Sequence, residues 1–190
     1  MDVKKRNYKK KSIWKNYKQR VVIKWIVDIL IVLALAFLLT FLFGAGITVQ
    51  ENSMNPTIHS GDMVLMNRLA AKTGGIKKGS IIVYVSDEDE EACHVKRVIA
   101  LPGDTIQIKD GLIMINGETY MEDLELPSII DPGLASEPVK LGPSEYFVLG
   151  DNRNSSEDSR YADVGNISSD EIKGVVWFLL NPSERRGFVR

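Results

Sequence analysis

Residues 29–49 form an uncharged and mostly apolar run of 21 residues, ILIVLALAFLLTFLFGAGITV. A helix of about 20 residues is long enough to cross the hydrocarbon core of a bilayer. A cleaved signal peptide has a shorter apolar core, so this length favours an anchor that is retained. We therefore predict a transmembrane anchor helix over residues 25–49, with a folded domain after it.

Basic residues are concentrated before this run. Residues 1–28 hold 10 lysines and arginines against 2 acidic residues, whereas residues 29–190 hold 14 against 23. Positive charge beside a span marks its cytoplasmic end. We therefore expect a single-pass protein of the cell membrane, with a basic cytoplasmic N-terminus over residues 1–24 and an extracytoplasmic domain over residues 50–190. The acidic character of the domain argues against nucleic acid as a partner, because the domain would repel phosphate.

Short apolar runs bounded by turn residues dominate the predicted domain. They lie at residues 63–66, 81–85, 146–149 and 174–180. Asp110-Gly111 and Asn116-Gly117 are typical of tight turns between paired strands. The pattern predicts a mainly β fold, with one compact β-rich domain behind the anchor. Cys93 is the single cysteine, so the core and not a disulfide must hold this domain together.

A lysine is the candidate base in a chain with few histidines. A serine hydroxyl is a weak nucleophile and needs a base within hydrogen-bond reach, but neither His59 nor His94 stands in a triad-like setting. Burial can lower the pKa of a lysine by several units and so free it to act as a base. Lys96 lies on a mostly apolar segment, where strand alternation puts it on one face with His94 and Val98. From this segment alone, a general base and a solvent-facing strand lysine are equally supported.

Three segments behind the apolar run resemble the sequence boxes of bacterial type I signal peptidases, peptidase family S26, in their single-span Gram-positive form. SMNPT from Ser53, followed by Gly61-Asp62, resembles the nucleophile box. KRVIALPGD from Lys96 resembles the lysine box, and GDNRNSSEDSR from Gly150 resembles the closing box. Any one of these motifs is weak evidence, because short motifs recur by chance, but three in order behind an anchor are strong.

The resemblance implies a function and a set of residues. It implies a signal-peptidase-like β fold and a serine endopeptidase that removes N-terminal signal peptides from exported preproteins, cleaving after small residues. Ser53 would be the nucleophile, Lys96 would be the base and neutral at rest, and Ser156 would hydrogen-bond and aim the lysine. The expected partners are secretory preproteins and the lipid bilayer. No cofactor is expected, and no metal, since no group of residues has metal-ligand spacing.

Two charged pairs also match positions of the family. The resemblance aligns Arg97 with Asp151, and Asp158 with Arg160, to ion pairs that brace the site. An equally supported interpretation is that these pairs only hold the fold.

Glu51 departs from the family pattern and leaves an alternative open. Relatives commonly have a small residue two positions before the nucleophile, and some use a serine hydroxyl there as an oxyanion donor. A carboxylate cannot donate and would repel an oxyanion. Either Glu51 points away, or the oxyanion hole depends on backbone N–H groups such as that of Ser53. The residue keeps open a weakly catalytic signal-peptidase-like protein that assists assembly of secreted or pilus proteins.

A second enzyme class shares the serine–lysine chemistry. Soluble self-cleaving peptidases of the SOS-repressor type have the same core β fold. The anchor and the box at residues 150–160 argue against them, as does the lack of a DNA-binding helix pair. His94 has two interpretations: a cation that acts on Lys96, or a histidine at the edge of the site, which the sequence favours.

Overall fold

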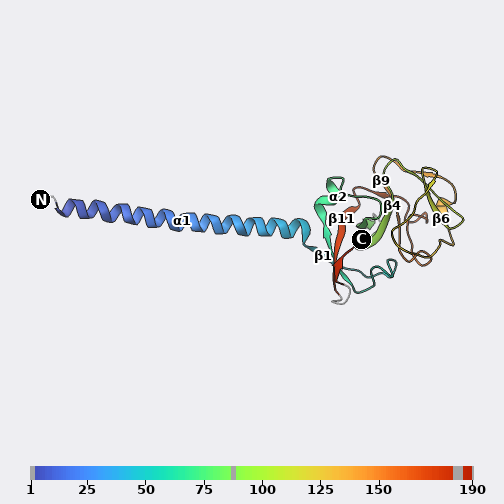
Figure 1. Ribbon diagram of the computed structural model, residues 1–190, viewed down its shortest axis with the longest axis horizontal. Coiled ribbons are helices and arrows are strands. Elements are labelled where there is room, and N and C mark those ends of the chain that lie inside the picture. Colours follow the sequence, from blue (N-terminus) through green and yellow to red (C-terminus); the bar gives the residue numbers. More distant parts are fainter. Residues whose placement is uncertain (1–2, 87–88, 182–185, 190) are drawn as a thin grey trace. The chain divides into compact units, whose positions relative to one another are not determined.

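The computed structural model describes residues 3–86, 89–181 and 186–189, so residues 1 and 2 of the predicted basic segment lie outside it. The chain divides into two compact units, Met1–Phe41 and Leu42–Arg190. The first unit is helical and the second is mainly β. The predicted fold class, an N-terminal helix followed by a β-rich domain, is confirmed (Figure 1).

Helix α1 runs from Val3 to Phe43. Its part Tyr17–Phe43 is long and apolar enough to cross a membrane, with a mean hydropathy of 2.9 in its most apolar window. The side chains of that window are exposed, which suits a lipid environment better than water. The helix ends at Phe43, short of the predicted end at residue 49, because Gly44 and Gly46 have low helix propensity.

Strands of the larger sheet occupy most of the second unit. Within the described residues this sheet has eight antiparallel strands in the order β1-β2-β11-β3-β4-β9-β10, with β12 paired to β11. Their bounds are β1 Ala45–Thr48, β2 Met63–Asn67, β3 Ile81–Ser86, β4 Asp89–Ala100, β9 Glu145–Leu149, β10 Ile167–Ser168, β11 Ile172–Asn181 and β12 Gly187–Phe188. The four apolar runs noted in the sequence lie on β2, β3, β9 and β11, which confirms them as strands.

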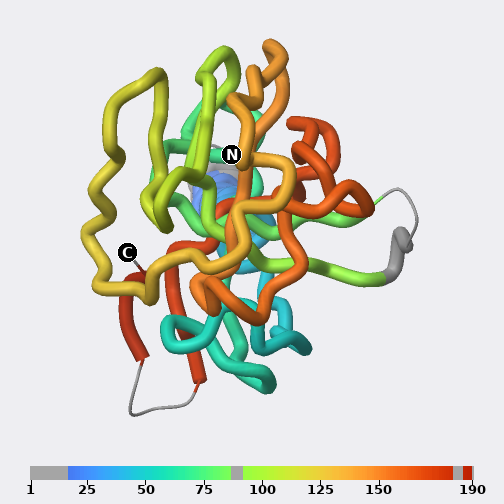
Figure 2. The backbone as a smooth tube through the Cα atoms, turned by 90° about the vertical axis from the view of Figure 1, so that its right-hand side faces the viewer, coloured from blue at the N-terminus to red at the C-terminus, as the bar shows by residue number. Residues whose placement is uncertain are grey.

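A smaller sheet of four strands, again counting only described residues, follows the order β7-β6-β5-β8. Its strands are β5 Thr105–Lys109, β6 Leu112–Ile115, β7 Glu118–Thr119 and β8 Val139–Lys140. Asp110 and Gly111 have φ angles of 52° and 77°, and Asn116 and Gly117 have 55° and 85°. These left-handed conformations are those of two-residue hairpin turns, so both predicted turns are confirmed. In Figure 2 this segment, yellow-green to yellow, lies to one side of the larger sheet.

Buried apolar side chains form three clusters among the described residues. One cluster lies against the smaller sheet and contains Ala135 of the 3-10 helix Gly133–Ser136. A second cluster joins β2, β3, β4 and β11 to the segment after β1, from which Met54 and Ile58 are fully buried. The third includes Ile82 and Tyr84 of β3 and lies near the short helix α2, Arg68–Lys72. The second cluster matters most for function, since it fixes the residues that follow Ser53.

Candidate active site

Ser53 lies on a closed loop between β1 and β2. Val49 N donates to the carbonyl of Asp62 at 2.8 Å, and Gly61 N donates to the carbonyl of Val49 at 2.7 Å. Met54, the next residue, is fully buried, and Ser53 itself is only 7% exposed. The hydroxyl is therefore carried by backbone that is fixed on both sides.

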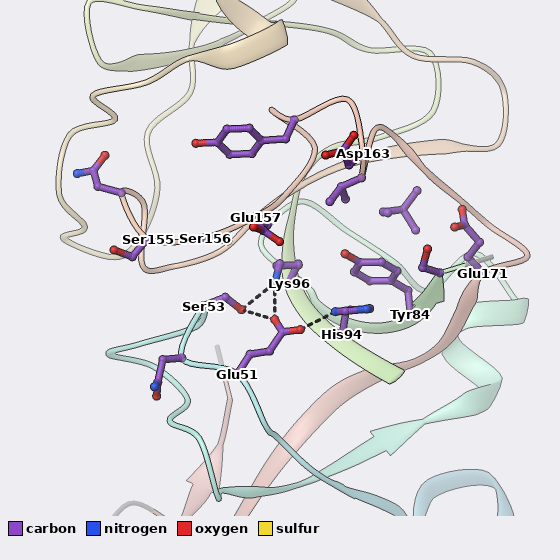
Figure 3. A pocket seen from close by; sticks show the side chains of 16 residues that line it. Glu51, Ser53, Tyr84, His94, Lys96, Ser155, Ser156, Glu157, Asp163 and Glu171 are labelled. Carbon is purple, nitrogen blue, oxygen red and sulfur yellow. Dashed lines mark hydrogen bonds and ion pairs between the residues drawn. The ribbon is translucent and has the colours of Figure 1, made fainter. Parts of the chain in front are cut away.

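Lys96 reaches this hydroxyl from the middle of β4. Strand alternation places Lys96 and His94 on one face and Arg97 on the other, and Lys96 pairs in register with Ile82 of β3. The lysine side chain is 2% exposed, and its Nζ lies 2.8 Å from Ser53 Oγ (Figure 3). The structure thus brings together the two residues that the sequence assigns as nucleophile and base.

Glu51 joins this pair. Its Oε2 accepts hydrogen bonds from Lys96 Nζ at 2.8 Å and from Ser53 Oγ at 3.1 Å. Its Oε1 lies 2.6 Å from His94 Nδ1. The hydrogen bond with His94, together with the charge of Lys96, outweighs partial burial and lowers the pKa of Glu51 to about 2. The side chain is therefore a carboxylate at neutral pH, and it forms an ion pair with Lys96.

The sequence left two alternatives open for Glu51, and the structure excludes the one in which it points away from the dyad, because its carboxylate lies against Lys96 Nζ. The buried lysine side chain likewise excludes a strand lysine that faces solvent. His94 contacts Glu51 and is not within ion-pair reach of a second anion among the described residues. The sequence did not predict the contact of Glu51 with the dyad, although one signal was present. In an extended chain, residues two apart, such as Glu51 and Ser53, share a face.

Ser156 lies near the dyad but does not form the hydrogen bond to Lys96 that the resemblance implies. Its Oγ is buried, yet it has no hydrogen-bond partner among the described residues, and Lys96 donates to Ser53 and Glu51 instead. The closing segment, residues 150–160, nevertheless contacts Ser53, since Asn152 N donates to the carbonyl of Ser53 at 2.9 Å. A Cβ at Gly150 would collide with that carbonyl and with Ser156. The close approach therefore requires glycine at position 150.

Arg97 and Asp151 form a buried, bidentate ion pair on the face of β4 opposite Lys96. Arg97 Nε and Nη2 each donate to Asp151 at 2.7 Å, and both side chains are almost fully buried. Asp151 Oδ2 also accepts from Thr57 Oγ1 at 2.5 Å. One carboxylate thus joins β4, the closing segment and the loop that carries Ser53. Thr57 is a member of this group that the sequence did not single out.

Asp158 and Arg160 form a second buried pair. Arg160 Nε and Nη2 donate to Asp158 at 2.8 and 2.9 Å. Asp158 Oδ2 also accepts from Gly150 N at 3.0 Å, and Arg160 Nη1 donates to the carbonyl of Asp131 at 3.0 Å. Buried charges are tolerated when they are paired and hydrogen-bonded in this way. This pair shapes the closing segment around Gly150 and does not contact the dyad.

A cleft of about 880 Å³ opens over the dyad. The residues that line it are Glu51, Asn52, Ser53, Tyr84, Ser86, His94, Lys96, Asn154, Ser155, Ser156, Glu157, Tyr161, Asp163, Val164, Ile167 and Glu171. Tyr84 lies against His94, with ring centroids 5.3 Å apart. Burial, and then the charge of Glu51, raises the pKa of Tyr84, so its phenol stays neutral. The cleft therefore has room for a peptide segment beside the serine.

Known proteins resemble this chain over most of its length. Residues 22–180 match the family described as signal peptidase, peptidase S26. Signal peptidase I P of Bacillus subtilis subsp. natto is 37% identical over 88% of this chain and 94% of its own. Signal peptidase IB of Staphylococcus aureus strain COL is 31% identical over 86% and 92%, respectively.

A solved structure is also similar. The crystal structure of a signal peptidase I from Enterococcus faecalis V583 is 29% identical, covers 53% of this chain and 95% of its own, and aligns with a TM-score of 0.43. The match of the family over residues 22–180 and the two relatives above 30% identity decide the assignment. The chain belongs to the signal peptidase family, peptidase S26, and is a serine endopeptidase of the type I class.

Proposed function

We propose that this chain is a membrane-anchored peptidase that removes N-terminal signal peptides from exported preproteins, with Ser53 as nucleophile and Lys96 as general base. The observation that carries the proposal is the 2.8 Å distance between Lys96 Nζ and Ser53 Oγ. Lys96 is buried and lines the cleft. An amine at this distance can take the hydroxyl proton once it is neutral. Membership of the family supplies the substrate class.

The reaction has two halves. In the first, Ser53 Oγ attacks the scissile carbonyl carbon while its proton passes to Lys96 Nζ, and the lysine then protonates the leaving amine of the mature protein. An ester links the signal peptide to Ser53. In the second half, Lys96 takes a proton from water, the resulting hydroxide attacks the ester, and the proton returns to Ser53. The backbone N–H of Ser53 is the donor that we assign to the oxyanion.

The substrate would lie extended in the cleft beside a strand edge. Backbone pairing of that kind gives affinity without reading a sequence. Small side chains at the first and third positions before the cut are what the resemblance implies for specificity. Ser156 is proposed to aim the neutral lysine during the reaction, and the Arg97–Asp151 and Asp158–Arg160 pairs are proposed to brace the loops around it.

Helix α1 is proposed to be the anchor. Its part Tyr17–Phe43 is suited to a bilayer, and lysines and arginines precede the most apolar stretch. The positive-inside bias then places the N-terminus in the cytoplasm and the β-rich domain outside. This orientation puts the peptidase where exported preproteins emerge.

The test is cleavage of a synthetic preprotein by the detergent-solubilised full chain. Ser53→Ala and Lys96→Ala should abolish cleavage, while Ser144→Ala and Lys173→Ala, at exposed positions outside the cleft, should cleave as wild type does. Equal cleavage by all five proteins would refute the dyad.

The Glu51–Lys96 ion pair favours one second candidate, a weakly catalytic relative that assists assembly of secreted or pilus proteins. The same assay separates the two candidates. Failure of the wild-type protein to cleave any of several preproteins would favour this second function.

A further inference from the structure

Glu51 brings a negative charge directly to the reacting atoms. Its Oε2 accepts from both Lys96 Nζ and Ser53 Oγ, and its Oε1 lies against His94 Nδ1 (Figure 3). Among the described residues, Lys96 Nζ hydrogen-bonds to Ser53 and Glu51 alone. The lysine is thus held on the serine by a carboxylate, which is itself held by a histidine.

Lys96 Nζ donates to Ser53 Oγ, and Ser53 Oγ donates to the Glu51 carboxylate. A carboxylate in contact with an amine favours the ammonium form, which has no lone pair for the serine's proton. Glu51 cannot replace the lysine as base. The bond with His94 and the charge of Lys96 lower the pKa of Glu51 to about 2, and so weak a base takes little of an alcohol's proton. Attack must therefore wait until Lys96 gives up its proton.

We propose that Glu51 is a positioning residue for this reaction, which holds the Lys96 ammonium on Ser53 in the resting protein. As the pH is lowered, activity is therefore lost at a higher pH than it would be without the carboxylate. The inference rests on the proposed function and deepens it. Its physical basis is that opposite charges in contact stabilise each other's ionised forms. His94 fixes the carboxylate from the side away from Lys96, so the ion pair is preformed.

Other titratable groups face this network from the neighbouring elements. They are Tyr84 from β3, Glu157 and Asp158 from the closing segment, Tyr161 and Asp163 from the loop before β10, and Glu171 from the turn before β11. Among the described side chains, Glu51 alone stands within ion-pair distance of Lys96. This contact singles out Glu51 as the group whose charge acts on the lysine.

The experiment is the pH profile of kcat/KM for preprotein cleavage by the full-length protein. Glu51→Gln keeps the shape and removes the charge, and the acid limb of its profile should move to lower pH by about one unit. Glu51→Ser, which places a small residue at this position, should move it in the same direction. Glu51→Asp keeps a charge and should move it less. Thermal unfolding of each variant shows that it is folded.

Asp170→Asn is the matched control, because it removes the same charge at an exposed position outside the cleft. Its acid limb should stay close to that of wild type. Coincident acid limbs for wild type, Glu51→Gln and Glu51→Ser would overturn the inference and leave the serine–lysine peptidase intact, as would an equal shift in Asp170→Asn. A wild-type protein that cleaves at no pH would instead overturn the proposed function.

Discussion

The imidazole of His94 holds the carboxylate of Glu51, with Nδ1 and Oε1 only 2.6 Å apart. This bond is the largest cause of the low pKa of Glu51, which falls from an ordinary value of 4.5 to about 2. A group whose pKa is lowered by folding stabilises the protein above its unfolded pKa and loses that contribution as pH falls through its folded pKa. The contact therefore links the site to acid stability.

The first prediction concerns this linkage. Wild type should be more stable than Glu51→Gln above about pH 4.5, and the difference should disappear as the pH falls toward 2. Urea unfolding of both proteins at several pH values measures it. A stability difference that is the same at pH 6 and at pH 3 would show that the carboxylate charge contributes nothing.

The second prediction concerns the close approach at Gly150. Gly150→Ala should displace either the Ser53 backbone or Ser156, because the added methyl group overlaps both. We expect kcat to fall by about a hundred-fold, because a displacement of about 1 Å in a base or nucleophile lowers the rate by about that factor. Gly187→Ala is the control, since no heavy atom lies within 4 Å of a Cβ there. Wild-type kcat in Gly150→Ala would mean that the closing segment does not position the serine.

The third prediction tests whether the Arg97–Asp151 ion pair positions the active site or only stabilises the fold. Arg97→Met should cost about 3–5 kcal/mol in the free energy of unfolding, because it leaves the buried Asp151 carboxylate without its partner. The double variant Arg97→Met, Asp151→Leu should recover part of that loss. If the pair also braces the site, the double variant stays folded but has a lower kcat. Full kcat in the folded double variant would make the pair structural only.

The fourth prediction concerns orientation. Cys93 is exposed and is the single cysteine, so it reports which side of the membrane the β-rich domain occupies. A membrane-impermeant maleimide should label it in intact protoplasts. A protein with Cys93→Ser and Ser12→Cys should be labelled only after permeabilisation. The reverse pattern would place the domain in the cytoplasm.

Local patterns predicted the parts of the fold that depend on neighbouring residues. The turns at Asp110-Gly111 and Asn116-Gly117 adopt the conformations that those residue pairs favour. Alternation along β4 placed Lys96 on one face with His94, and both residues line the cleft. The end of α1 was placed too late, because apolar composition continues past Gly44 while helix propensity does not.

The site was harder to predict where it depends on contacts between distant segments. Glu51 lies 45 residues from Lys96 in sequence, and no local pattern says that its side chain turns toward the lysine. The bond of Thr57 to Asp151 spans 94 residues and was missed for the same reason. Ser156 was expected to bond Lys96, but in the structure Glu51 takes that place.

Ser53 and Lys96 are proposed to act as one unit. The most direct measurement is kcat for Ser53→Ala, Lys96→Met and the double variant, on one preprotein and with folding checked for each. We predict that each single variant loses about a thousand-fold or more in kcat and that the double variant loses no more than either, because the effects of residues that act together are not additive. Independent losses that multiply in the double variant, or near-wild-type cleavage by Lys96→Met, would contradict it.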